Sequence, residues 1–250
     1  MGHSQGGGAA WATAIREFTN PTPGYLGTIA GSPTTNLTGE IDLLADVVPP
    51  TLGLFWAEAI KNLHPEFNQS LVLTDQGLER LRLAREWGMC NSATGVLLSD
   101  FPGSDNGTIL RERWYMVPEI AEYLGLCDVG TQKVKGPMLV LQGTEDSAVP
   151  FQFTDASVAS TCAVMDGETG WGGVEYVRFE GVDHVPVLFA GQRIWLSWLA
   201  ERFAGVRKEG SAPGAGCTTT NYTAQVMPIG NYQKELEYFL ELATESYQVA

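Results

Sequence analysis

Two short apolar runs, each followed by a helical pattern, constrain the fold of this chain more than any other feature. The runs are Met138 to Leu141 and Val174 to Glu180, and the helical patterns cover 152–165 and 186–203. Such an alternation of strand and helix is typical of a parallel sheet with helices packed on its faces. The sequence therefore predicts an α/β fold.

These patterns divide the chain into four segments. The stretch from 34 to 136 is mostly helical, contains no repeat and interrupts the strand–helix alternation, as an insertion would. Within the tail, the apolar spacing from Tyr232 to Ala243 predicts one further amphipathic helix. The segments are 1–33, a glycine-rich turn, its helix and a strand at Tyr25 to Ala30; 34–136, the helical insertion; 137–206, the later core; and 207–250, a C-terminal extension.

The glycine-rich turn carries a candidate nucleophile. Gly2, Ser4 and Gly6 match Gly-x-Ser-x-Gly, in which a serine occupies a strained turn between a strand and a helix. We expect a side chain at position 2 or 6 to collide with neighbouring backbone. The serine oxygen would then lie above the helix N-terminus, where amides such as that of Gln5 stabilise negative charge. A merely flexible glycine-rich segment is the alternative interpretation.

A serine hydroxyl needs a base, and the chain offers three histidines. His184 follows a strand and precedes a helix, at the sheet edge where catalytic groups of α/β proteins gather. His3 adjoins the serine and should point away from its oxygen, while His64 lies in the helical insertion. The sequence therefore favours His184 as the base, with a buried structural histidine as the alternative.

The acid that holds this base is expected in the loop after the preceding strand. Asp146 lies there and is our candidate, with Glu145 as a competing acid. Asp183 is less favoured because a neighbour of His184 cannot easily reach its ring. Asp146 could instead be a helix N-cap or turn residue.

Charge and cysteine spacing exclude several functions. Fifteen Lys and Arg against 29 Asp and Glu give a net charge of −14, so phosphate backbones would repel the chain and nucleic acid is a poor partner. The cysteines form no Cys-x-x-Cys pair and lie near no histidine cluster, so we expect no metal site. Apolar runs are too short for a transmembrane segment.

Glycosylation signals suggest the compartment. Asn-x-Ser/Thr triplets occur more often than chance predicts for this composition, which with the acidic surface favours a secreted glycoprotein. The N-terminus nevertheless lacks the basic and apolar regions of a signal peptide. The four triplets begin at Asn36, Asn68, Asn106 and Asn221.

The order Ser4, Asp146, His184 is that of α/β-hydrolases. Within that superfamily the sequence resembles fungal secretory lipases of the lipase A type. The resemblance rests on Gly2-His3-Ser4-Gln5-Gly6-Gly7, the helical region after Ser32-Pro33, Gly143-Thr144-Glu145-Asp146, Asp183-His184, and the cysteines Cys162 and Cys217.

This resemblance implies a partial α/β-hydrolase fold, with a mostly parallel sheet, the later strands only, and a helical cap. It implies a serine-dependent carboxylic ester hydrolase acting through an acyl-enzyme, with Gln5 in the oxyanion hole and acylglycerols or fatty esters as substrates. It also implies secretion, no cofactor and a Cys162–Cys217 disulfide. The protein could also contact a lipid interface transiently. The sequence does not indicate the oligomeric state.

The resemblance further implies that strands precede the glycine-rich turn in the intact fold. We therefore expect the chain to be the C-terminal part of a longer protein, weakly active without a second oxyanion donor, with a missing neighbour beside the strand at Tyr25 to Ala30. A serine peptidase or thioesterase of the same fold, or a non-catalytic fragment, are the rival interpretations.

Two interpretations of the insertion stay open. Its apolar positions could line an acyl tunnel or simply pack in a core. Cys90 and Cys127 could form a disulfide or remain thiols, and Cys90 could instead pair with a cysteine outside this sequence. The apolar positions are Leu52, Phe55, Trp56 and Ile60.

Overall fold

A computed structural model describes most of the chain, as two compact units. The described residues are 1–44, 50–91, 93–95, 109–205, 216–223, 232–233 and 238–239. One unit comprises 1–36 and 127–250, and the other comprises 37–126. The second unit falls inside the range 34–136 expected for the insertion, and its function as a cap stays a prediction.

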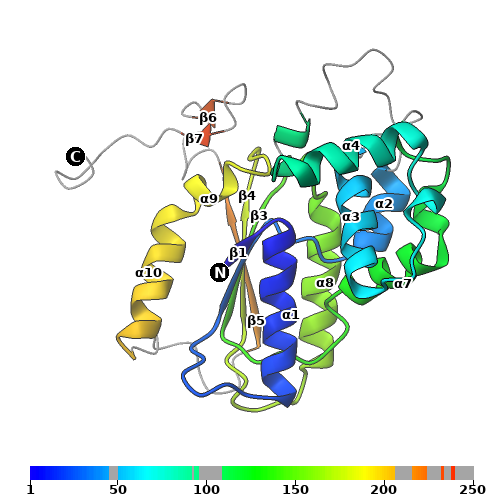
Figure 1. The fold of residues 1–250 in the computed structure, drawn as a ribbon. Helices are drawn as coiled ribbons and strands as arrows, with labels where there is room; N and C mark the ends of the chain where they lie inside the picture. Colours follow the sequence, from blue (N-terminus) through cyan, green and yellow to red (C-terminus); the bar gives the residue numbers. More distant parts are fainter. Residues whose placement is uncertain are drawn as a thin grey trace. The chain divides into compact units, whose positions relative to one another are not determined.

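The first unit is built on a five-stranded sheet whose neighbouring strands are all parallel (Figure 1). The strands follow one another across the sheet in sequence order. Because parallel neighbours need crossover connections, helices separate most of them along the chain. The strands are β1 (Gly2–His3), β2 (Thr28–Gly31), β3 (Met138–Gly143), β4 (Val174–Phe179) and β5 (Cys217–Tyr222).

Helices cover both faces of this sheet (Figure 1). On one face lie α1 (Gln5–Thr19) and α8 (Phe151–Val164), and on the other lie α9 (Val187–Ala190) and α10 (Gln192–Phe203). Every residue of β3 is buried, as expected for a strand covered on both sides.

Alternate residues along the strands contribute to two separate cores. Val140 belongs to the core that contains Trp11 of α1, and Leu141 belongs to the core that contains Trp198 of α10. This alternation follows from the two-residue period of a β-strand. The predicted α/β architecture is confirmed.

Several element boundaries differ from expectation. The strand expected at Tyr25 to Ala30 is β2, which begins later in the sequence. It pairs with both β1 and β3, so the expectation that one neighbour of this strand is missing was wrong. The helix expected at 186–203 is divided at Gly191 into α9 and α10.

The C-terminal segment also differs. Strand β5 was not predicted, because its run of threonines lacks an apolar face. The helix expected from Tyr232 to Ala243 is wrong for the described residues there, which form the short antiparallel pair β6 (Tyr232–Gln233) and β7 (Tyr238–Phe239).

A disulfide joins Cys162 of α8 to Cys217 at the first residue of β5. It closes a separation of 55 residues and attaches strand β5 to the helical layer. This confirms the implied pairing. Cys90 and Cys127 are not disulfide-bonded, so the bridge considered between them is absent.

The second unit is helical. Helix α4 begins at a capped N-terminus, where the Thr74 hydroxyl accepts a hydrogen bond from the N–H of Gly77. No helix in the described part of the chain has both the length and the apolar character needed to cross a bilayer. The elements are α2 (Leu37–Leu44), α3 (Pro50–Leu63), the 3₁₀ turns η1 (Gln69–Leu71) and η2 (Trp114–Met116), α4 (Asp75–Glu86) and α7 (Pro118–Cys127).

Of the four apolar residues that could line an acyl tunnel or pack in a core, two are buried in this unit and two are half-buried. Trp56 and Ile60 are buried, and the Trp56 ring lies 5.6 Å from the ring of Trp114. A cavity of about 360 Å³ in the unit is lined by other residues, so these positions do not line it. Its lining consists of Thr38, Ile41, Arg113, Tyr115, Met116, Ala121 and Leu124.

Candidate active site

Ser4 occupies a strained turn between β1 and α1. Its backbone has φ 58° and ψ −125°, a conformation that costs energy for any residue with a Cβ. The Ser4 N–H donates to Gly31 O at 2.9 Å, and Ser4 O accepts from the N–H groups of Gly7 and Gly8. The hydroxyl makes no N-cap hydrogen bond, so the turn holds Ser4 by its main chain alone.

Close backbone contacts explain three of the glycines around Ser4. A Cβ on Gly2 would lie 1.9 Å from Gly6 O, which no side chain could tolerate. Gly6 itself has open space around a Cβ position, so the collision expected there was wrong. Gly7 and Gly8 instead lie against backbone of 31–34, where a Cβ would approach carbonyl oxygens to 2.8 and 2.5 Å.

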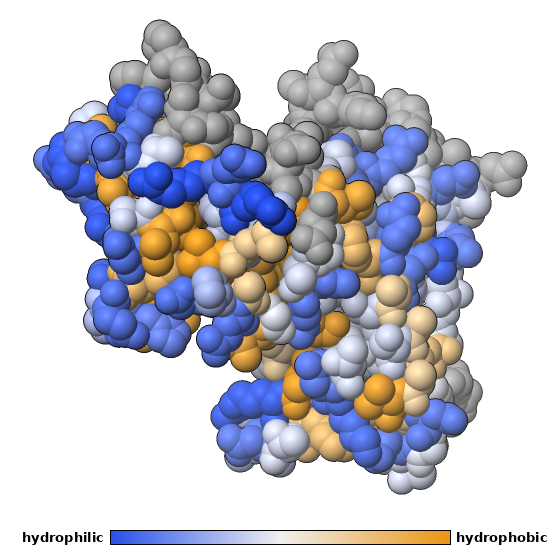
Figure 2. Space-filling view, turned by 90° about the vertical axis from the view of Figure 1, so that its right-hand side faces the viewer, coloured by the Kyte–Doolittle hydropathy of each residue, from blue (hydrophilic) through white to orange (hydrophobic). Residues whose placement is uncertain are grey.

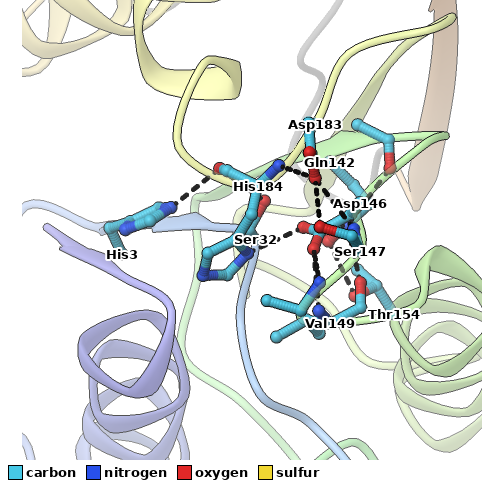
Figure 3. Close-up of polar contacts among 11 residues, drawn as sticks. His3, Ser32, Gln142, Asp146, Ser147, Val149, Thr154, Asp183 and His184 are labelled. Carbon is cyan, nitrogen blue, oxygen red and sulfur yellow. Dashed lines mark hydrogen bonds and ion pairs between the residues drawn. The ribbon is translucent and has the colours of Figure 1, made fainter. Parts of the chain in front are cut away.

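Asp146 and His184 form a hydrogen-bonded pair. Nδ1 of His184 lies 2.9 Å from Oδ2 of Asp146 in the structure (Figure 3). Because a carboxylate only accepts, Nδ1 carries the hydrogen and Nε2 is left to accept a proton. The Asp146 side chain is fully buried, and its Oδ1 accepts from the N–H groups of Ala148 and Val149.

Gln142, near the end of β3, holds the Asp146 side chain by a hydrogen bond. Its Nε2 donates to Asp146 Oδ2 at 2.9 Å and to Val149 O at 3.2 Å. Its Oε1 accepts from the hydroxyl of Thr154 at 2.9 Å. This buried amide is therefore bonded on both sides and holds the carboxylate in place, a function that the sequence analysis missed.

Asp183 connects the two loops that carry the pair. Its Oδ1 accepts from the N–H and hydroxyl of Ser147 and from the N–H of His184. Burial raises the pKa of Asp183, but these hydrogen bonds lower it by more, so the net pKa lies below its usual value. Asp183 is thus a bridge between loops and does not contact the imidazole ring as an acid would.

The main-chain carbonyl of His184 is held as well. Nε2 of His3 lies 2.9 Å from it, and the hydroxyl of Ser32 donates to it at 3.4 Å (Figure 3). Ser32 has a positive φ of 38° and is fully buried, so it belongs to the rigid turn after β2. No pattern in the sequence indicated either contact.

All three predicted residues follow the carboxyl ends of parallel strands. Ser4 follows β1, Asp146 lies after β3, and His184 lies after β4, so they share one edge of the sheet. No hydrogen bond joins the Ser4 hydroxyl to His184 among these described residues; such bonds often tighten only with substrate bound. Gln5 is exposed at the first helical position, where its N–H has no acceptor within the helix. Their catalytic roles stay predictions.

Other candidate residues lie elsewhere. The His64 side chain is exposed just after α3 in the second unit, near Glu66. The Glu145 N–H donates to Val182 O, whereas the His184 ring contacts Asp146. The described residues contain no group of three His, Cys, Asp or Glu side chains arranged to hold a metal ion.

Comparison with protein families adds the decisive observation. The model of the family described as secretory lipase matches residues 1–210 of the chain. The chain belongs to the secretory lipase family. A comparison with curated proteins gave no significant match.

Solved structures of a lipase and an esterase share the fold of this chain. Candida antarctica lipase A matches with a TM-score of 0.67 and 16% identity, over 98% of this chain and 60% of that one. Its closed state matches with a TM-score of 0.65 and 19% identity, over 90% and 54%. The rice cell wall degrading esterase LipA from Xanthomonas oryzae matches with a TM-score of 0.55 and 13% identity, over 81% and 55%.

The chain therefore spans 54% to 60% of the length of these proteins. At such low identity the likeness establishes the fold alone. It confirms the predicted α/β-hydrolase architecture, of which the chain carries the part with the parallel strands described above.

Proposed function

We propose that the protein is a serine-dependent carboxylic ester hydrolase that acts on acylglycerols or fatty esters. The observation that carries the proposal is the hydrogen bond between buried Asp146 and half-buried His184, at the sheet edge where the strained turn presents Ser4. The family and the lipase and esterase structures support the same reaction class.

The first half of the reaction forms an acyl-enzyme. Nε2 of His184 takes the Ser4 proton while the serine oxygen attacks the ester carbonyl carbon. The carbonyl oxygen becomes an oxyanion, to which the Gln5 N–H donates. Collapse of this intermediate breaks the bond to the alcohol, which leaves with the proton from His184.

Water completes the cycle. His184 takes a proton from water as the water oxygen attacks the acyl carbon. Collapse of the second intermediate breaks the bond to the Ser4 oxygen, which takes that proton back from His184 as the carboxylic acid is released. Asp146 keeps the imidazole in the Nδ1–H tautomer and stabilises the cation that forms in both halves. Gln142 and Asp183 hold these groups in position.

We expect slow hydrolysis by this chain alone. Gln5 is the oxyanion donor that the described residues supply, and loss of one such donor typically costs about 10²- to 10³-fold in rate.

Hydrolysis of p-nitrophenyl esters of increasing acyl length tests the proposal. Ester cleavage that rises with acyl length and is lost in both Ser4→Ala and His184→Ala supports a lipase-like esterase. Preference for peptide anilides or for acyl thioesters would instead assign a peptidase or a thioesterase. Cleavage unchanged by Ser4→Ala rejects the proposed nucleophile, and no cleavage of any substrate favours a non-catalytic protein.

We further propose that the protein is a secreted glycoprotein, as the secretory family suggests. Of the four signals, Asn68 and Asn221 are exposed and Asn36 is half-buried, while Asn106 lies outside the described residues. Exposed positions are accessible to the modifying enzyme, so we expect glycans at Asn68 and Asn221. Secretion from a eukaryotic host followed by glycosidase digestion and mass measurement checks this; an unchanged mass contradicts it.

Transient contact with a lipid interface has support from exposed apolar residues. Val185 and Phe189, which flank the site on the His184 side, are 38% and 43% exposed. A separate observation is that hydrophobic residues gather in patches bordered by hydrophilic ones on the side of the molecule that lies at the right of Figure 1 (Figure 2). We expect Phe189→Ser to slow hydrolysis of an emulsified ester more than that of a dissolved one, and an equal effect on both contradicts interface contact.

A further inference from the structure

His3 contacts the candidate base in two ways, although the two histidines are 181 residues apart. Its Nε2 lies 2.9 Å from the main-chain oxygen of His184. Because a carbonyl oxygen only accepts, the hydrogen must reside on Nε2 of His3. The two rings also pack together, with centroids 4.6 Å apart and a tilt of 45° (Figure 3).

The surroundings of His3 favour its neutral form. Burial is the largest influence and lowers the pKa of His3; its hydrogen bond to His184 raises the pKa and the charge of His184 lowers it again. The net pKa lies below the usual 6.5. A neutral ring with hydrogen on Nε2 can therefore donate to the carbonyl without opposing the positive charge that His184 gains when it accepts a proton.

We propose that His3 is a positioning residue for His184, which acts by holding the main chain of the base beside the nucleophile. The proposal rests on the proposed function, because it assigns His184 as the base. His3 is covalently adjacent to Ser4, so its hydrogen bond connects the strained serine turn directly to the backbone of His184. Asp146 and Asp183 hold the ring and the N–H of His184 from the opposite side.

Charged groups near His3 are few. His184 and Asp146 are the ones that act on its charge. Strand β2, the first turn of α1 and α9 carry no ionisable side chain. A Cβ built on Gly31 of β2 would lie 2.7 Å from a methyl carbon of Leu188 in α9 and 3.7 Å from a ring carbon of His3, so the apolar Leu188 side chain and the His3 ring both lie close to Gly31. A substitution at His3 can therefore remove its hydrogen bond to His184 without also breaking an ion pair.

Two substitutions separate the donor from the ring. His3→Phe keeps a ring of similar size but has no donor, and His3→Gln keeps an N–H donor but no ring. We expect His3→Phe to lower kcat by up to about 100-fold with little change in KM, because misplacement of a catalytic group by about 1 Å can cost that much in rate. His3→Gln should recover most of this loss.

A second readout does not depend on turnover. The Nδ1 hydrogen of His184, bonded to Asp146, should give a downfield proton NMR resonance that is sharp in the unsubstituted protein and in His3→Gln but broadened or lost in His3→Phe. His64→Phe replaces an exposed histidine in the other unit and should change neither readout. If His3→Phe does not fold by circular dichroism, His3→Leu serves as the variant without a donor.

The outcomes are distinct. A His3→Phe protein with the original kcat and the original resonance overturns the proposal, and so does a His3→Gln protein as impaired as His3→Phe. If Ser4→Ala leaves hydrolysis unchanged, the proposed function fails, but the NMR comparison of the His3 variants still tests the link between His3 and His184.

Discussion

The substitution Gln142→Glu tests how the Asp146 carboxylate is held in place. It replaces a single non-hydrogen atom of the side chain. The substitution keeps the side-chain shape but replaces an NH₂ group by an oxygen. That group now donates to Asp146 Oδ2 at 2.9 Å and to Val149 O at 3.2 Å, inside the protein. Glutamate would place a second carboxylate against the first, while Thr154 could still donate to the other oxygen.

The two carboxylates can either both stay charged and repel each other, or share one bound proton. The folded variant adopts whichever of these costs less free energy. Two charges at this separation repel by about 6 kcal/mol at an effective dielectric of 20. Binding one proton avoids this, and raising a glutamate pKa from about 4.3 to above 7 costs about 4 kcal/mol at pH 7. The folded state should therefore bind a proton that the unfolded state lacks, and the variant should lose about 4 kcal/mol of unfolding free energy at pH 7.

The sign of the pH dependence distinguishes this mechanism from simple loss of hydrogen bonds. Because the folded-state pKa is raised, the penalty is small below the unfolded pKa and grows by about 1.4 kcal/mol per pH unit as pH rises. Urea unfolding followed by tryptophan fluorescence at pH 5 and pH 7 should show a difference in destabilisation of about 2.7 kcal/mol.

A matched control makes the same chemical change at the surface. Gln152 is exposed in the first turn of α8, and Gln152→Glu should change stability by less than about 0.5 kcal/mol at either pH. If Gln142→Glu is equally destabilised at pH 5 and pH 7, the two carboxylates do not share a proton and the reasoning is refuted.

Three further predictions concern the turn, the disulfide and the loop bridge. Gly2→Ala should lower the thermal midpoint sharply because its Cβ would lie 1.9 Å from a carbonyl oxygen, whereas Gly6→Ala, with open space, should not; equal melting curves by circular dichroism contradict this. Replacing Cys217 by serine removes a bridge across 55 residues and should cost about 4 kcal/mol in urea unfolding, so an unchanged midpoint rejects that contribution. Asp183, whose pKa is lowered, stabilises the fold above pH 3.8, and Asp183→Ala should approach wild-type stability only as pH falls through the folded pKa; a gap constant with pH is the contrary result.

The serine turn could be predicted from the sequence because its chemistry is local. Gly2 and Ser4 are close in sequence, and the collision at position 2 follows from the turn itself. The prediction failed at Gly6 because the helix continues into open space there, while Gly7 and Gly8 approach a distant segment of backbone.

The position of the Asp146–His184 pair was also predictable, since both residues follow buried parallel strands and the carboxyl ends of such strands share an edge. The residues that support the pair were not. Gln142 looks like an ordinary strand residue, and the contact of His3 with His184 depends on β1 lying beside β2. Tertiary contacts of this kind leave no periodic signal.

The predictions for β5 and for the C-terminal tail failed for different reasons. The threonines of β5 carry no apolar alternation, and the strand is held by pairing with β4 and by the disulfide at Cys217. The apolar spacing from Tyr232 to Ala243 fits a helix, yet β6 and β7 form there, because short periodic runs do not distinguish the two structures.

Identification of the serine that reacts with a fluorophosphonate tests the central claim most directly. The protein is treated with the reagent, and its adduct is located by intact mass and peptide mapping. We predict one adduct, on Ser4, that is lost in Ser4→Ala and forms far more slowly in His184→Ala. An adduct on another serine, or undiminished labelling of Ser4→Ala, would contradict the assignment of Ser4 as the nucleophile.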